Sequence, residues 1–149
     1  MAPNIKDIEE IFFQAMKHGY AKGDVKKITI PEFPNLKVIP FEAGEFKVHD
    51  CYLTIPGLNN STGSTTIRHN GIPVWIMYYG GWYEKYAIPF LKECLLQAYK
   101  KERFYGGRGL NFVQNDSFIY TNKIEQGDFA NRMHGDLQRS THKSRSSCQ

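Results

Sequence analysis

Cysteine is scarce in this sequence, and long apolar runs are missing. The 149 residues include only three cysteines, whose odd number and wide spacing suit neither a disulfide framework nor a zinc site. No run of about 18 apolar residues occurs, and the N-terminal segment has acidic residues where a secretory signal needs a basic start. These absences predict a soluble cytoplasmic protein that has no contact with a membrane.

Motifs for metals, nucleotides and cofactors are also missing. Four of the five histidines are isolated in the sequence and make no metal-binding pattern. The stretch YGGRG, residues 105–109, is neither a Walker loop nor a dinucleotide fingerprint, and we interpret its glycines as a helix cap. We therefore predict no metal and no cofactor.

Positive charge is concentrated at the C-terminal end. Residues 132–149 contain four Lys or Arg and one acid, so that the rest of the chain carries a net charge of +1 out of +4. This polar tail lacks apolar periodicity, and we predict that it is disordered, with a phosphate-binding arm as the alternative. A nucleic-acid partner is not expected, because the folded part lacks a basic face.

What the sequence does contain is a large aromatic fraction and alternating strand patterns. A chain that is 41% hydrophobic and 14% aromatic is long enough for one domain, which we place at residues 1–131. Apolar residues at helical spacing predict a helix near 5–18, capped by Asn4, and another near 88–102, with Pro89 in its first turn. The oligomeric state stays open.

The remaining segments read as strands joined by turns. Asn70-Gly71 predicts a two-residue type I′ hairpin turn, and Asn115-Asp116 predicts a further hairpin. The strand segments are residues 36–41, 45–55, 65–69 and 72–83. The order predicts an α+β fold, a mainly antiparallel sheet covered by two helices in a single domain.

The segment 73–83 is apolar on both sides of its pleat. Val74, Ile76 and Tyr78 alternate with Trp75 and further apolar residues, so we predict that this strand is interior to the sheet. Its aromatic residues are either the middle of the sheet or the lining of a pocket, since buried Tyr and Trp need polar partners.

Asp50 shares one face of its strand with apolar residues. A carboxylate that faces a core must be paired, and such groups are enriched at functional sites. We predict that it lies in a concave pocket that binds a small ligand with a polar or cationic group. The predicted ligand-binding residues are Asp50, Tyr52, Trp75, Tyr79 and Tyr120. The alternative is a structural ion pair of Asp50 with Arg68 or Arg108.

Three classes of function fit these features. A small-molecule or peptide binding module is our prediction, and the ligand is not identified by the sequence. An enzyme is the second class, with Asp50 and Tyr52, or Cys51 and His49, as the groups that could act. The third is an accessory domain that contacts protein or nucleic acid through a sheet edge or the tail.

Several stretches carry a resemblance to a known family. GYAKG, FKVHDCY, NGIPVWIMYYGG, IPFLKECLLQA and FIYTNKIEQGDF, within residues 8–129, resemble an uncharacterised bacterial domain family. Members of that family occur alone or behind a helix-turn-helix DNA-binding domain, which implies a sensor role. The family pattern continues with a glycine-and-acid strand, from which ANRMHGDLQRSTHKS departs.

Overall fold

The structure is a computed structural model, and it describes residues 1–21, 25–104, 109–122 and 129. The chain divides into two compact units, Met1–Glu84 and Lys85–Gln149. The predictions made for the tail, for the YGGRG glycines 106 and 107, and for Arg108 lie outside the described residues. The single domain predicted for residues 1–131 and the packing of the second helix on the sheet stay predictions.

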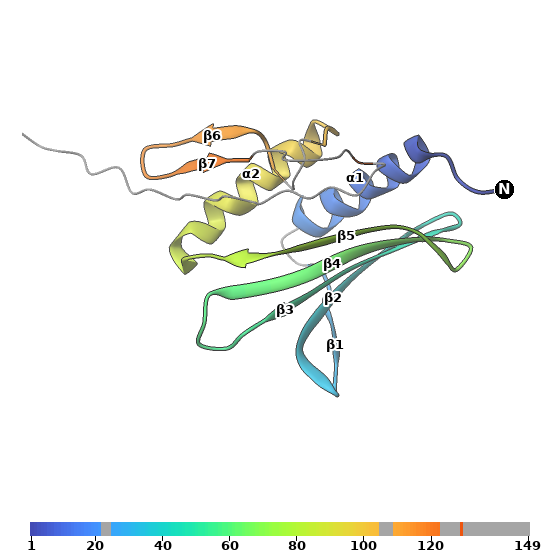
Figure 1. Ribbon diagram of the computed structural model, residues 1–149, viewed down its shortest axis with the longest axis horizontal. Helices are drawn as coiled ribbons and strands as arrows, with labels where there is room; N and C mark the ends of the chain where they lie inside the picture. Colours follow the sequence, from blue (N-terminus) through green and yellow to red (C-terminus); the bar gives the residue numbers. More distant parts are fainter. Residues whose placement is uncertain (22–24, 105–108, 123–128, 130–149) are drawn as a thin grey trace, which may run out of the picture. The chain divides into compact units, whose positions relative to one another are not determined.

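Unit 1 is one helix and a five-stranded antiparallel sheet (Figure 1). The strands are β1 (Ile28–Ile30), β2 (Phe33–Ala43), β3 (Phe46–Thr54), β4 (Asn60–His69) and β5 (Ile72–Trp82). They lie in the sheet in the same order as in the sequence, and each pairs antiparallel with the next. With the helices, this confirms the predicted α+β class and its mainly antiparallel sheet.

Local sequence explains the turn between β4 and β5. Asn70 and Gly71 have φ angles of 49° and 81°. Two successive positive φ angles are what a type I′ turn requires, and Asn and Gly are the residues that adopt them most easily. The predicted hairpin is confirmed, and it fixes the pairing of His69 with Ile72 and of Arg68 with Pro73. A register shift between Ile67 and Arg68 then sets Ile67 opposite Trp75.

The helix of unit 1, α1 (Ile5–Ala21), covers one face of this sheet. Its first turn is capped as predicted, since Asn4 Oδ1 accepts a hydrogen bond of 2.9 Å from the Asp7 amide. The Phe12 ring is fully buried, and its centroid lies 5.3 Å from that of Trp75 on β5. The buried residues of the helix are Ile8, Ile11, Phe12, Phe13, Ala15 and Met16.

The interior position predicted for the segment 73–83 is wrong. In the described part of the chain, β5 pairs with β4 alone and forms an edge of the sheet. Ile76 and Tyr78 are 48% and 78% exposed. Apolar residues on both faces therefore do not make this strand central, because one face packs on α1 while the other is exposed. Strand β1 and the first residues of β4 were also not predicted.

Unit 2 contains a short helix, a longer helix and a hairpin. These are η1 (Lys85–Ala87), α2 (Ile88–Lys100), β6 (Phe112–Gln114) and β7 (Ile119–Thr121). Phe90, Cys94 and Tyr120 form its buried cluster, and the rings of Phe90 and Phe118 stack with centroids 5.5 Å apart. The second helix and the second hairpin are thus confirmed, and Glu102, with a φ of 50°, follows directly after the C-cap of α2.

Candidate functional site

The face of the sheet under α1 brings together four of the five predicted site residues. Strand register pairs Asp50 with Thr65 and Thr65 with Met77, which places these residues in one row across the sheet. The neighbouring row is made by Tyr52, Gly63 and Tyr79. Trp75 belongs to the next row on the other side, opposite Ile67. Asp50, Tyr52, Trp75 and Tyr79 therefore share one face.

The Asp50 carboxylate is buried in this face and is held by two hydroxyl groups. The residue is 4% exposed, so its carboxylate requires polar partners in place of water. Thr65 Oγ1 donates to Asp50 Oδ1 over 2.9 Å, and the Tyr79 hydroxyl donates to the same oxygen over 2.7 Å. The three residues come from β3, β4 and β5, so the position of the carboxylate depends on the pairing of all three strands.

Gly63 makes the bond between Tyr79 and Asp50 geometrically possible. A Cβ atom on Gly63 would lie 2.6 Å from both Cζ and the hydroxyl oxygen of Tyr79, and closer still to the carbonyl oxygen of Cys51. The Tyr79 ring thus crosses β4 over a residue that has no side chain, and its hydroxyl reaches the carboxylate on β3. Glycine at this position is explained by the close approach of an aromatic ring.

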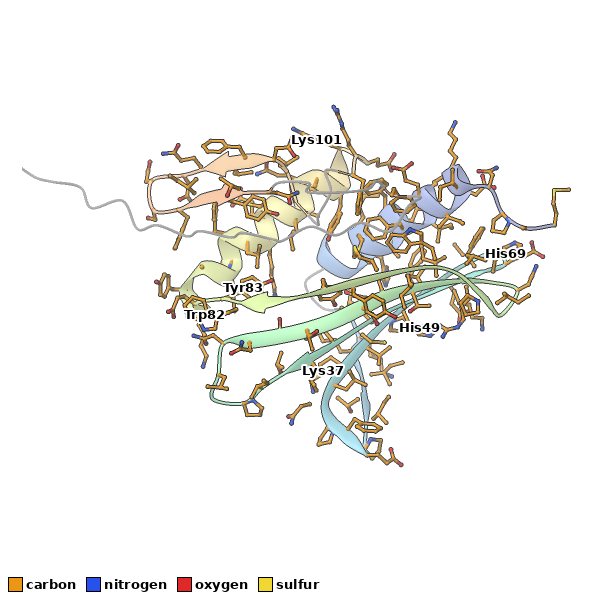
Figure 2. The ribbon with its side chains drawn as sticks, in the orientation of Figure 1. Lys37, His49, His69, Trp82, Tyr83 and Lys101 are labelled. Carbon is orange, nitrogen blue, oxygen red and sulfur yellow. The ribbon has the colours of Figure 1, made fainter. Side chains whose placement is uncertain are left out.

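Positive charge lies beside Tyr52 at the same face. The Lys27 ammonium group is 5.4 Å from the centroid of the Tyr52 ring, which is within range of a cation–π interaction. Lys37 on β2, labelled in Figure 2, is the register partner of Tyr52. The aromatic surface next to Asp50 therefore already holds an amine from within the chain.

Tyr120 is the fifth predicted site residue, and it belongs to unit 2. Its side chain is buried in the cluster with Phe90 and Cys94, and its hydroxyl lies over Gly109. Its membership of a site with Asp50 stays a prediction.

The opposite face of the sheet holds Arg68, His49 and Cys51, which belong to two of the alternatives to a binding site. Arg68 pairs with Lys47, whose position on β3 is of opposite parity to Asp50, so Arg68 lies on the other face. There its Nη1 donates to His49 Nδ1 over 3.4 Å. An ion pair between Asp50 and Arg68 does not fit this arrangement, and Arg108 is outside the described residues.

The Cys51 and His49 pair has the wrong protonation preference for a nucleophile. Burial raises the pKa of the Cys51 thiol above its usual value, and the neighbouring Asp50 raises it further. Burial and then the Arg68 guanidinium hold the pKa of His49 below its usual value. A reactive cysteine needs a thiolate at neutral pH, which this environment disfavours.

Thr65, Gly63 and Lys27 were not predicted from the sequence. Gly63 lies in the predicted turn around residues 56–63, and Thr65 is the first residue of the strand predicted for 65–69, where its position gave no signal of a contact with Asp50. Placing them opposite β3 requires the length of the β3–β4 turn, which no local pattern specifies. The sequence did offer the two-residue turn after β4, which helps to set which residues of β4 and β5 lie opposite each other.

Searches of known proteins add no functional assignment. Comparison of the chain with protein-family models, with curated proteins and with solved structures found no match.

Within the described residues, no helix combines the length and the apolar character needed to cross a membrane, and no cluster of three metal-binding side chains occurs.

Proposed function

We propose that unit 1 is a binding module for a small ligand that carries an amine or another hydrogen-bond donor. The ligand contacts Asp50, Tyr52, Trp75 and Tyr79 on the face of the sheet that α1 partly covers. The observation that carries the proposal is the buried Asp50 carboxylate, which two hydroxyl donors hold in a fixed position among aromatic rings. Convergent polar groups in apolar surroundings are typical of ligand sites.

The preference for a cationic group follows from the chemistry of this face. A carboxylate forms charge-assisted hydrogen bonds with amines, and aromatic faces attract cations with about 0.5 to 2 kcal/mol. The Lys27 ammonium over the Tyr52 ring is an example of such a contact in this protein. An amine ligand would use the same surface. The cytoplasmic location and the resemblance to a bacterial family stay predictions that agree with a sensor role.

The test is a thermal-shift screen with aliphatic and aromatic amines, each beside the alcohol of the same shape. We expect amines to raise the melting temperature of the protein more than the matched alcohols do, because an amine brings a positive charge as well as a hydrogen-bond donor to Asp50, whereas an alcohol brings the donor alone. Asp50→Asn should remove the amine effect while the protein stays folded, since the amide retains an acceptor for Thr65 and Tyr79.

Tyr78→Phe is the matched control, because Tyr78 is exposed on the other face of the sheet. The amine effect should be the same in this variant as in the unchanged protein. Equal stabilisation of Asp50→Asn and of the unchanged protein by every amine would overturn the proposal.

A further inference from the structure

The edge strand β5 carries no charged residue. It stands at the end of the strand order, and no other described residue pairs with its outer edge. Its eleven residues, IPVWIMYYGGW, include no Asp, Glu, Lys or Arg. Exposed sheet edges normally contain charges, prolines or bulges, which prevent pairing with a strand of another chain. An edge of this length without charges is suited to strand pairing.

The two edges of the sheet differ in this respect. The other edge strand, β1, has three residues, a register shift between Thr29 and Ile30, and Lys27 directly before it. On β5, the protecting features lie in its first part, where Pro73 occurs and the register with β4 shifts. Residues 76–82 of β5 have no such feature.

The backbone groups of this segment have a defined direction. Tyr83 donates its amide to the Asn59 carbonyl over 3.0 Å, and Thr62 Oγ1 donates to the Tyr79 carbonyl over 3.1 Å. Odd-numbered residues here thus turn their backbone groups toward β4. Antiparallel pairing alternates, so the even-numbered residues turn theirs to the outer edge. These outward-facing residues are Ile76, Tyr78, Gly80 and Trp82.

Large apolar side chains accompany these outward backbone groups. Ile76, Tyr78 and Trp82 are 48%, 78% and 55% exposed. Figure 2 labels Trp82 near the C-terminal end of β5. Pairing with another strand would cover these side chains and would satisfy the backbone groups beside them.

We propose that two copies of the chain pair antiparallel through residues 76–82 of β5, around a two-fold axis at Tyr79. This register sets Tyr78 opposite Gly80 of the second copy and Ile76 opposite Trp82. The aromatic–glycine pair repeats the arrangement of Tyr79 over Gly63 within the sheet. Because both strands have the same uncharged sequence, no like charges meet. The contact is two-fold symmetric, so it joins two copies and does not extend into a filament.

Neighbouring registers are less complementary. Moving the axis to Tyr78 sets two tyrosines opposite each other and brings Trp82 against the register shift near Val74. Moving it to Gly80 sets Tyr78 opposite Trp82, but it places two glycines opposite each other at the axis, where no side chain can pack. The register around Tyr79 is the one in which each outer aromatic side chain meets a small or an aliphatic partner: Tyr78 meets Gly80, and Trp82 meets Ile76.

Sedimentation of the full chain over a concentration series up to about 1 mM tests the proposal. We expect a monomer–dimer equilibrium. Residue-resolved amide exchange should slow at the four even-numbered residues as the concentration rises. Tyr78→Lys should raise the dissociation constant at least about tenfold, because it brings charge to the edge of both copies.

Leu53→Lys is the matched control, since Leu53 is exposed on the same face but lies on β3. It should leave the dissociation constant unchanged. If Tyr78→Lys fails to fold by circular dichroism, Ile76→Lys provides the same test at another edge position. The proposal is overturned by a monomer at all concentrations, by even-numbered amides that are already slow at the lowest concentration, or by equal weakening in the control. It is independent of the ligand proposal, because Asp50→Asn should dimerise normally.

Discussion

The hydroxyl of Tyr79 links two strands of the sheet through a single carboxylate oxygen. Tyr79 on β5 and Thr65 on β4 both donate to Asp50 Oδ1 on β3. A buried carboxylate that loses a donor keeps its desolvation cost, so that each bond contributes more to stability than its exposed equivalent would. These three side chains therefore serve the stability of the sheet as well as the proposed site.

Tyr79→Phe should lower the free energy of unfolding by about 1 to 2 kcal/mol, because it removes one donor from the carboxylate. Urea denaturation measures this change. Tyr78→Phe is the control: its hydroxyl is exposed on the other face, and its loss should change the stability by less than about 0.5 kcal/mol. Equal losses in the two variants would show that the bond to Asp50 contributes nothing.

His49 should make the protein sensitive to mild acid. Burial and Arg68 hold its pKa below 6.5, so the unfolded chain binds a proton at a higher pH than the folded protein does. Stability from this group is complete above pH 6.5 and is lost as the pH falls from 6.5 through the lowered pKa. His49→Gln should remove that part of the pH dependence, as measured by urea denaturation between about pH 5 and 7. An unchanged slope in the variant would contradict the assignment.

At the level of elements, the hairpin of β4 and β5 depends on two different uses of glycine. Gly71 supplies a positive φ angle in the turn, which is a local requirement. Gly63 supplies space for the Tyr79 ring, which is a requirement of the packed sheet. The first can be recognised from the dipeptide Asn-Gly, whereas the second depends on which residue lies opposite.

Gly63→Ala should destabilise the protein by about 1 to 3 kcal/mol and displace Tyr79 from Asp50. The added Cβ would collide with the Cys51 carbonyl oxygen, which belongs to the sheet backbone and cannot rotate away. Gly80→Ala is the control in dilute protein, because its Cβ would have its nearest contacts at 3.3 Å, and we expect a smaller loss. Equal losses in the two variants, measured by thermal unfolding, would contradict this explanation.

For the whole molecule, the division into two units has a consequence for folding. Unit 1 has a core of its own between α1 and the sheet, which includes Phe12, Val48 and Ile67, all at most 1% exposed. A unit with its own hydrophobic core can fold as a domain.

A fragment of residues 1–84 should therefore fold without the rest of the chain. We expect dispersed amide resonances and a cooperative thermal transition, because α1 covers the apolar side of the sheet within this fragment. A broad transition without cooperativity would show that unit 1 depends on residues 85–149.

Sequence alone determined the features that depend on neighbouring residues. The cap at Asn4, the hairpin turn at Asn70-Gly71 and the shared face of Asp50 and Tyr52 were all predicted correctly. Each follows from side-chain chemistry within a few residues or from the two-residue period of a strand.

Tertiary structure decided which segments became neighbours. It placed β5 at an edge, Arg68 on the face away from Asp50, and the Tyr79 hydroxyl on the carboxylate. A strand pattern shows which residues share a face, but it does not show whether a second strand lies alongside. These outcomes depend on strand order and loop length. They are stabilised by contacts between residues far apart in the chain, and a local sequence pattern contains no information about such contacts.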